Sequence, residues 1–467
     1  MSDFDDIPSF VMAAEHAVSS AAINVRLRET RRDRVMRRWS MSEVAEILDC
    51  PRSYLYSLLK HPDAPEGVLR GREKTLGVDD IMRLRALASA RPGSQKDMLN
   101  WRKPGDPLKI ITISSQKGGT GKSLVASHLS QGLCLLGQRV LVIDCDPQAT
   151  CSLYFVSSDV EVAGPDVETF AEFMGVPEPG ADRPIIHSPA RLNSFLRATP
   201  WPGLRLLPGG AAIQEADIAM YFLSQSRQPD ARRVYRMLHD ALDRWSAAHP
   251  PRTQPQDFLD GNGRFREEAY QAALTETVDV VIMDTAPSLT LAQLNAVVAA
   301  STLVIPQTFR GFDLATLQIY LSSLNDYLGF IARDRDPVAF PKARPFILPT
   351  IVARNDTDIR TIGEIYAANP GIISPIFYRY SDGASNALRD FKSAFEYEPE
   401  KARRASMRAF ADNANAVNDA IISRALPHLP SRGLADAFIR ETYPEGAIPR
   451  WADAPPDPVY PLEEDVA

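Results

Sequence analysis

The chain has 467 residues, 45% of them hydrophobic, and a formal net charge of −7 at pH 7. Such a chain can bury a large core and is expected to form about three domains. It has no run of about 18 or more apolar residues, which argues against a membrane-spanning helix. Four cysteines without metal-ligand spacing, together with an acidic start that lacks a signal-peptide pattern, predict a cytoplasmic protein with reduced thiols.

Residues 1–38 are predicted to form a basic segment whose helix can pair with a second copy of the chain. Seven arginines lie between Arg26 and Arg38, against Glu29 and Asp33. Residues 1–103 carry a net charge of +3, whereas the remainder carries −10. This asymmetry is typical of a basic helix beside a nucleic-acid-binding unit, although a solvated helix face would have a similar composition.

Residues 39–90 are predicted to form a winged helix-turn-helix that binds DNA. A helix capped by Ser40, a tight turn at residues 49–51 and a second helix over residues 52–60 have the spacing of this motif. Residues 67–76 have the pattern of a β-wing, and another helix starts at Val78. The expected DNA-contacting residues are Arg52, Ser53, Tyr54 and Tyr56 in the second helix and Arg70, Arg72 and Lys74 in the wing.

Residues 91–106 are predicted to be a linker, because they contain Pro92-Gly93 and Pro104-Gly105. An α/β domain is expected to follow over residues 107–427. Its first element is an apolar strand at residues 110–113, which leads through a glycine-rich turn into an amphipathic helix at residues 124–136. This order predicts a phosphate-binding loop at the helix N-terminus.

The loop itself contains the residues expected to bind nucleotide: Lys117, Gly118, Gly119, Thr120, Gly121, Lys122 and Ser123. Backbone N–H groups would surround the phosphates, Lys122 can reach the β- and γ-phosphates, and the Ser123 hydroxyl can ligate Mg²⁺. Lys117 is a second lysine in the same loop. Because one loop needs only one lysine for its own nucleotide, Lys117 suggests a role at the nucleotide of a neighbouring subunit.

Three aspartates follow two further apolar strands and are expected to meet at the nucleotide. Asp144 and Asp146 end the strand that begins at Arg139, and Asp284 ends the strand at residues 278–283. Parallel sheets place their ligand site at the carboxyl ends of the strands. Asp284 is predicted to support Mg²⁺, and Asp146 to orient the water that attacks the γ-phosphate.

The remainder of the chain is less informative. Strands are expected at residues 204–210, 300–306 and 344–352, and amphipathic helix over residues 213–246. Residues 152–277 look like an insertion, with a surface loop at residues 249–264. The tail at residues 428–467 is rich in proline, ends in acidic residues, and is expected to be mostly poorly ordered.

The motifs Lys117–Ser123, Asp144-Cys-Asp-Pro-Gln148 and Asp284-Thr-Ala-Pro-Ser288 resemble those of ParA/MinD deviant phosphate-loop ATPases. With the N-terminal unit, the layout is similar to the ParA proteins of repABC-type replicons. The resemblance implies an α/β fold with a parallel sheet and an ATP sandwich dimer. It further implies that Lys117 crosses to the partner's nucleotide, that Lys117, Lys122 and Asp146 are catalytic, and that Asp144 lies near the metal with Ser123 and Asp284.

For function, the resemblance implies an ATP- and Mg²⁺-dependent DNA-segregation ATPase that also represses its own operon. Its expected partners are a centromere-binding protein of the ParB/RepB type, operator DNA and, through the ATPase dimer, nonspecific nucleoid DNA; no membrane partner is expected. Candidates for the nonspecific DNA surface are Arg354, Arg360 and Arg389. A nucleotide-responsive transcriptional repressor with little ATPase turnover is the alternative, because nucleotide binding and hydrolysis use the same loop.

Overall fold

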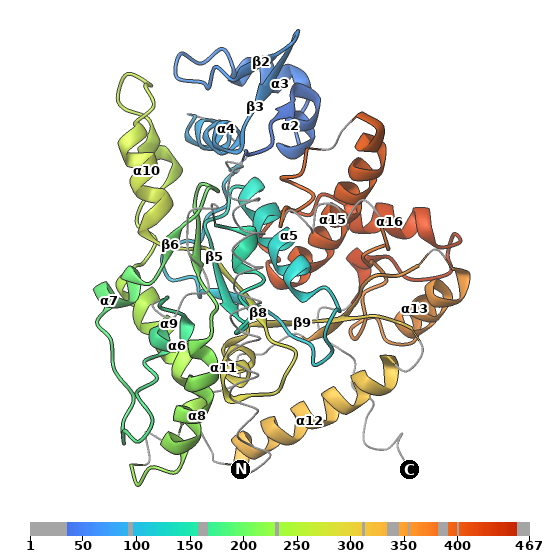
Figure 1. Cartoon of the computed structure of the whole chain (residues 1–467). Helices are drawn as coiled ribbons and strands as arrows, with labels where there is room; N and C mark the ends of the chain where they lie inside the picture. The colour runs from blue at the N-terminus through green and yellow to red at the C-terminus, as the bar shows by residue number, and fades with distance from the viewer. Residues whose placement is uncertain are drawn as a thin grey trace, which may run out of the picture.

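In this computed structural model, the described residues are 35–91, 97–156, 167–228, 233–310, 313–333, 345–353, 355–381, 391–398 and 401–454. The predicted pairing helix within residues 1–38 therefore lies almost entirely outside the described residues. The described chain forms a small N-terminal domain above a large α/β domain (Figure 1).

The N-terminal domain has helices and a small antiparallel sheet in the predicted order of helix, turn, helix and hairpin. Ser40 caps the first helix, as the sequence predicted, and the backbone N–H of Ser40 donates to the Glu43 carboxylate. The sheet order is β1-β3-β2, so the hairpin of β2 and β3 forms the wing. The elements are β1 (Trp39–Ser40), α2 (Met41–Ile47), α3 (Arg52–Leu58), β2 (Val68–Arg70), β3 (Glu73–Leu76) and α4 (Val78–Ala90).

A seven-stranded sheet forms the centre of the large domain, in the order β10-β9-β4-β8-β5-β7-β6. All strand pairs are parallel except that of β6 with β7. The apolar strands are buried on both faces, which is typical of parallel sheets. The strands are β4 (Lys109–Ile113), β5 (Val140–Cys145), β6 (Arg197–Ala198), β7 (Leu204–Leu207), β8 (Val280–Thr285), β9 (Thr302–Gln307) and β10 (Phe346–Pro349).

Helices cover both faces of this sheet, and alternate strand residues belong to separate cores. In β8, Ile282 packs in the core with α5 and α15, whereas Met283 packs on the opposite face. The opposite face is covered by α6 (Phe170–Met174), α7 (Pro189–Ser194), α8 (Ala212–Ser224), α9 (Met237–Ala248) and α11 (Leu291–Ala299). The α5 side includes α5 (Lys122–Leu135), α10 (Glu267–Glu276), α12 (Asp313–Arg333), α13 (Asp356–Ala368), α15 (Arg404–Ala425) and α16 (Leu434–Thr442). Short 3₁₀ turns lie at Ser152–Tyr154, Val234–Arg236, Pro255–Phe258, Lys401–Arg403 and Trp451–Asp453.

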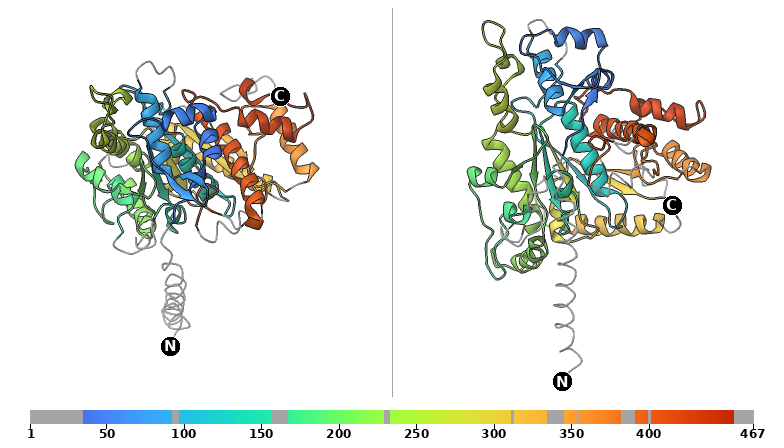
Figure 2. Two further views of the ribbon diagram at one scale, coloured as in Figure 1. Left: turned by 90° about the horizontal axis from the view of Figure 1, so that it is seen from above. Right: turned by 45° about the horizontal axis from the view of Figure 1, so that its top comes forward.

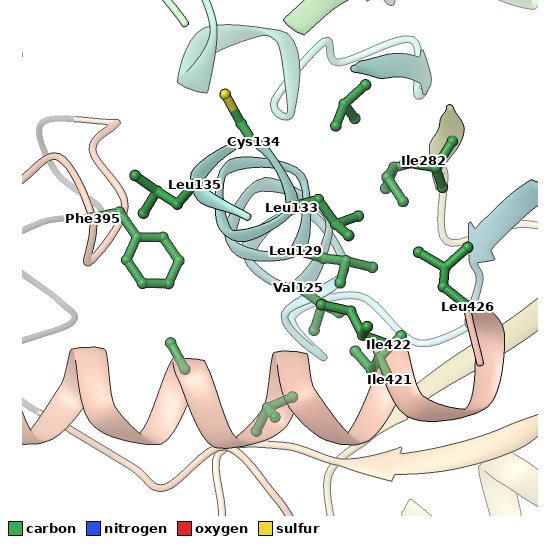
Figure 3. Packing of buried hydrophobic residues seen from close by; sticks show 14 of the residues in the cluster. Val125, Leu129, Leu133, Cys134, Leu135, Ile282, Phe395, Ile421, Ile422 and Leu426 are labelled. Carbon is green, nitrogen blue, oxygen red and sulfur yellow. The ribbon is translucent and has the colours of Figure 1, made fainter. Parts of the chain in front are cut away.

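Helix α5 is the central packing element of its side of the sheet. Figure 3 looks along α5, with α15 crossing beside it and Ile421, Ile422 and Leu426 facing Val125 and Leu129. The contact between the two helices is close at Gly132, where an added Cβ would lie 2.3 Å from Asn418 Nδ2. The helix that begins at the phosphate loop is therefore held along its length by apolar packing.

The far end of α5 lies against the N-terminal domain. Arg85 of α4 is buried and donates to three backbone carbonyls: Leu135 O at the end of α5 (2.7 Å), Met98 O (3.1 Å) and Ile47 O at the end of α2 (2.6 Å). Burial lowers the pKa of Arg85 to about 10, so its guanidinium stays charged at neutral pH. One side chain thus joins α2 and α4 of the N-terminal domain to α5 of the large domain.

Part of the predicted insertion makes a second contact with the N-terminal domain. Arg264 pairs with Asp63, which follows α3, and the backbone N–H of Phe265 donates to Asp63 Oδ2 at 2.9 Å. Arg83 of α4 lies over the Phe265 ring, 5.1 Å from its centroid. The insertion also supplies β6 and β7 of the main sheet, so it includes integral parts of the domain.

Two segments pack more closely than their composition suggests, and the expectation of a mostly poorly ordered tail is wrong. The predicted linker is packed where the structure describes it: Trp101 Nε1 donates to Gly137 O at 2.7 Å, and buried Arg102 donates to Val278 O at 3.1 Å. The tail is folded over residues 428–454, because Phe438 of α16 and Trp451 are buried against the α15 side. Trp451 Nε1 also donates to Ser423 Oγ at 2.8 Å. In both segments a few large side chains supply apolar surface, although the many prolines favoured the prediction of an irregular chain.

Candidate nucleotide-binding site

The glycine-rich loop connects the end of β4 to the first residue of α5, where the sequence predicted it. Gly119 and Gly121 have φ values of +73° and +82°, a backbone region that favours glycine. A Cβ added at Gly118, Gly119 or Gly121 would meet no atom within 4 Å, so one side of the loop is open. The loop therefore has the backbone shape and the free space that a phosphate group requires.

Lys122 and Ser123, the first residues of α5, lie beside Asp284 at the end of β8. Ser123 Oγ donates to Asp284 Oδ2 at 2.6 Å, and Lys122 Nζ donates to Lys117 O at 3.1 Å. Burial, with the nearby Asp144 carboxylate, raises the pKa of Asp284 well above its usual range. Burial also lowers the pKa of Lys122, and the charges of Asp284 and Asp146 oppose that shift.

The second oxygen of Asp284 is the observation that bears on magnesium. Asp284 Oδ1 is buried and has no hydrogen-bond partner among the described residues. A buried carboxylate oxygen without a partner is costly unless a ligand satisfies it. The adjacent Ser123 hydroxyl and this carboxylate are hard oxygen donors, so the residues present fit Mg²⁺.

Asp144 and Asp146 lie at the neighbouring strand end but have different surroundings. Asp144 is opposite Asp284 in the β5–β8 register, and its Oδ2 accepts from Ser152 N at 2.8 Å and Ser152 Oγ at 2.7 Å. Its Oδ1 accepts from Asp146 N at 3.1 Å. These bonds hold the turn that carries Asp146. The pKa of Asp144 is raised to about 6 by burial, against the effect of the Ser152 bonds.

The Asp146 carboxylate accepts fewer hydrogen bonds than the Asp144 carboxylate. Its Oδ1 accepts one bond, from Gln148 N at 2.8 Å, and its side chain is at the edge of the buried region. Gly209, after β7, passes so close that an added Cβ would lie 2.4 Å from Asp146 O. Sequence reasoning did not place Gly209 at the site, although Pro208-Gly209-Gly210 after a strand was a signal that could have done so.

The side chain of Lys117 reaches the start of α12. Its Nζ forms an ion pair with Asp313 Oδ1 and lies 3.3 Å from Thr308 Oγ1. Thr308 and the backbone N–H of Arg310 also donate to Asp313. Sequence reasoning missed Asp313 and Thr308, because no local pattern marks a partner nearly two hundred residues away. Within this chain Lys117 is therefore engaged beside the nucleotide site.

The predicted DNA-contacting residues of α3 are mostly exposed. Arg52 and Ser53 are exposed at the start of α3, Tyr56 is 53% exposed, and Tyr54 is half-buried against the core. Arg52 donates to the Ser42 hydroxyl of α2. Arg52, Ser53 and Tyr56 are therefore accessible to solvent in the monomer.

The wing residues differ from one another. Arg72 is exposed and Lys74 is half-buried, but Arg70 Nη1 pairs with Glu398 Oε2 of the α/β domain at 2.6 Å. Among the candidates for the second DNA surface, Arg360 is exposed on α13, whereas Arg354 and Arg389 lie outside the described residues. Figure 1 shows α13 well apart from α3 and the wing.

Comparison with known proteins decides the family. The model of the CobQ/CobB/MinD/ParA nucleotide binding domain matches residues 111–368, which is more than half of the chain. The chain belongs to this family. The matched range contains the phosphate loop, the three strand-end aspartates and Asp313.

Individual relatives are distant. The chain is 24% identical over 296 residues to a "Putative replication protein A" of Rhizobium rhizogenes, covering 63% of each chain. It is 22% identical over 397 residues to a protein of the same name from Sinorhizobium fredii, covering 83% of this chain and 86% of the other. A solved structure titled "Partition Protein" matches 87% of this chain and 99% of its own, with a TM-score of 0.51 and 16% identity, which supports the fold. Among the described helices, none is long and apolar enough to cross a membrane.

Proposed function

We propose that this protein is an ATP-dependent DNA-segregation ATPase of the ParA type. The observation that carries the proposal is the arrangement of Lys122, Ser123 and Asp284 around an open glycine loop, with Lys117 as a second loop lysine. Family membership and the replication and partition names of the similar proteins support it.

Each side chain has a role that its position favours. Loop N–H groups and Lys122 would bind the phosphates and compensate the charge that develops on them. Ser123 and Asp284 would hold Mg²⁺, with Asp144 supporting the turn behind them, and the bound ion would supply further neutralisation of phosphate charge. Asp146 would orient the attacking water, since its carboxylate is only partly engaged.

Dimerisation and DNA binding belong to the same proposal. Two copies would enclose ATP in a sandwich dimer, in which Lys117 leaves Asp313 and contacts the partner's nucleotide. The N-terminal domain would bind the operator through Arg52, Ser53, Tyr54 and Tyr56, and so repress its own operon. The ATP-bound dimer would bind nucleoid DNA nonspecifically, with Arg354, Arg360 and Arg389 as candidates, until a ParB/RepB-type protein stimulates hydrolysis.

A nucleotide-responsive repressor with little turnover is the second candidate, because the exposed α3 surface does not depend on hydrolysis. Steady-state ATP hydrolysis, measured with nonspecific DNA and the cognate centromere-binding protein, separates the two. The segregation ATPase predicts stimulation by both together and its loss in Lys122→Ala. An ATP hydrolysis rate that stays at its basal value would favour the repressor, provided that the partner is shown to bind the protein. Isothermal calorimetry of Lys122→Ala tests the site itself: ATP binding with wild-type affinity would contradict the phosphate-loop assignment.

A further inference from the structure

Ser152 joins the ends of two neighbouring strands beside the nucleotide site. Its hydroxyl donates to Asp144 Oδ2 at 2.7 Å and accepts from Gly209 N at 3.1 Å, and its backbone N–H donates to Asp144 Oδ2 at 2.8 Å. Asp144 belongs to β5, and Gly209 lies in the turn between β7 and α8. One fully buried hydroxyl thus holds the Asp144 carboxylate on one side and the β7–α8 turn on the other.

The hydrogen bonds of Asp144 continue to Asp146, the residue proposed to orient the attacking water. Asp144 Oδ1 accepts from Asp146 N at 3.1 Å. Ser152 supplies two of the three hydrogen bonds that the described residues donate to Asp144. Because Asp144 is fully buried and lies opposite Asp284 in the strand register, its carboxylate depends on these donors to keep its orientation. Ser152 therefore fixes the acceptor to which the Asp146 backbone is bonded.

The turn that carries Asp146 has a backbone conformation that needs such support. Ala149 N donates to Asp146 O at 2.9 Å and closes the turn, and Ala149 has a φ of +52°. Residues other than glycine rarely adopt this conformation, and they keep it only where the surrounding contacts fix them. Gly209 packs closely on the same turn, since a Cβ added there would lie 2.4 Å from Asp146 O. Ser152 bonds both Gly209 and Asp144, so it supports the strained turn from two directions.

This arrangement is separate from the groups that are proposed to bind ATP and from the N-terminal domain. Lys122 and Ser123 bond to Lys117 and Asp284. Helix α8, which follows the turn of Gly209, lies at the end of the molecule opposite the N-terminal domain in Figure 1 and in the right-hand view of Figure 2. A change at Ser152 should therefore affect the position of Asp146 while the ATP-binding groups stay in place.

We propose that Ser152 is a positioning residue for ATP hydrolysis, which acts through Asp144 to fix the position of Asp146. The inference rests on the proposed ATPase function and on the proposed role of Asp146. Without the hydroxyl, Gly209 N–H loses its acceptor, and Asp144 Oδ2 keeps only the bond from the Ser152 backbone. Asp146 is then held less firmly, and hydrolysis slows because phosphoryl transfer depends on how the attacking water is placed.

The test compares full-length Ser152→Ala with wild type, in ATP turnover with nonspecific DNA and the cognate centromere-binding protein, and in ATP affinity by calorimetry. We expect kcat to fall by about 10-fold or more, since a misplacement of about 1 Å can cost on the order of 10²-fold. The affinity for ATP should not change. Equal kcat values for Ser152→Ala and wild type, or a loss of ATP affinity as large as the loss of kcat, would overturn the proposal.

Ser130→Ala is the matched control for the loss of a buried hydroxyl. Ser130 is also fully buried, and its hydroxyl donates to Ala126 O within α5 at 2.7 Å. Its kcat should equal that of wild type. A fall in kcat as large as that of Ser152→Ala would show that loss of any buried hydroxyl near the loop slows turnover, and the proposal would be wrong.

A double-mutant cycle shows whether Ser152 acts through Asp146. In the Asp146→Ala background no carboxylate remains to be positioned, so adding Ser152→Ala should not lower kcat further. Single-turnover measurements keep the slow rates of this background accessible. A general disturbance of the fold would slow both backgrounds by the same factor, and that result would also overturn the proposal.

The same measurements separate this inference from the function on which it rests. If wild type hydrolyses ATP no faster than Lys122→Ala, the ATPase function is wrong and the inference falls with it. If Asp146→Ala turns over like wild type, the role of Asp146 and the inference are wrong, but the ATPase function stands. If Asp146→Ala is slow and Ser152→Ala has the wild-type rate, the inference alone is wrong.

Discussion

Lys117 of the phosphate loop and Asp313 of α12 form an ion pair within one chain. Asp313 is buried, and although burial opposes ionisation, the hydrogen bonds from Lys117 and Thr308 hold its pKa below the usual range. The lysine proposed to cross a dimer interface is therefore engaged inside its own subunit. The proposed sandwich dimer would require Lys117 to exchange this partner for a phosphate group.

The first prediction is that Asp313→Asn favours the ATP-dependent dimer. The substitution removes the charge that retains Lys117 but keeps an oxygen that Thr308 and the Arg310 N–H can donate to. Light scattering over an ATP titration should show dimer formation at lower nucleotide concentration than in wild type. Asp326→Asn, on an exposed part of the same helix, is the control. A dimer that is unchanged or weaker in Asp313→Asn would contradict an intrasubunit restraint on Lys117.

The second prediction concerns Lys117 itself. Lys117→Ala should bind ATP in calorimetry, because Lys122 remains, but should lose ATP-dependent dimerisation. Full-length protein is needed, because the core of the N-terminal domain is continuous with that of the ATPase domain and truncation would expose it. Comparing each sample with and without ATP separates ATP-dependent dimerisation from any pairing through residues 1–38. The same ATP-dependent dimer in Lys117→Ala and wild type would argue against a lysine that crosses the interface.

The third prediction is that Asp146→Ala binds ATP and forms the dimer but hydrolyses ATP slowly. Loss of a group that positions water or accepts its proton costs on the order of 10²-fold or more in rate. Asp144→Ala is the informative comparison, since it removes the acceptor of both Ser152 bonds and should lower the melting temperature as well. Stimulated turnover of Asp146→Ala close to wild type would show that another group orients the water.

The fourth prediction concerns the contact of Asp63 with Arg264. The pKa of Asp63 is lowered to about 2, chiefly by the Arg264 hydrogen bond and then by the Phe265 N–H. A lowered pKa in the folded state stabilises the fold above the unfolded value of about 4, and this contribution is lost as the pH falls toward 2. We expect the difference in unfolding free energy between wild type and Asp63→Asn to shrink over that range. A double-mutant cycle of Asp63→Asn with Arg264→Ala should give a non-zero interaction free energy at pH 7. If the two effects simply add, the contact does not hold the insertion to the N-terminal domain.

Local patterns in the sequence were enough to predict the parts of the site that lie within one strand–turn–helix unit. The glycine turn before Lys122 and the carboxylates after two apolar strands are local signals, and the parallel sheet brings them together. The Ser40–Glu43 cap was predictable for the same reason. Asp313 was not, because its partner Lys117 is chosen by the packing of α12 against the loop. The roles of Ser152 and Gly209 likewise arise only when separate strand ends meet.

The packing of the predicted linker and the order in the tail escaped prediction for a different physical reason. Proline, glycine and charge dominate the composition of both segments, and composition averages over residues. A single Trp101 or Trp451 with a buried hydrogen bond can nonetheless anchor a segment whose mean hydropathy is low. Arg85 and Arg102 were equally hard to place, since a buried arginine that donates to backbone carbonyls and hydroxyls of distant segments has no sequence signature.

Arg85 bears on the proposed binding of DNA by a dimer. It joins the N-terminal domain to α5 and to the segment around Met98, and Asp63 joins the same domain to the insertion. In a symmetric dimer, the distance between the two reading helices would then be set by the ATPase interface. Each nucleotide-dependent geometry of that interface would then correspond to one spacing between operator half-sites. The nucleotide bound at the phosphate loop would thus set which half-site spacing on the double helix the dimer can bind.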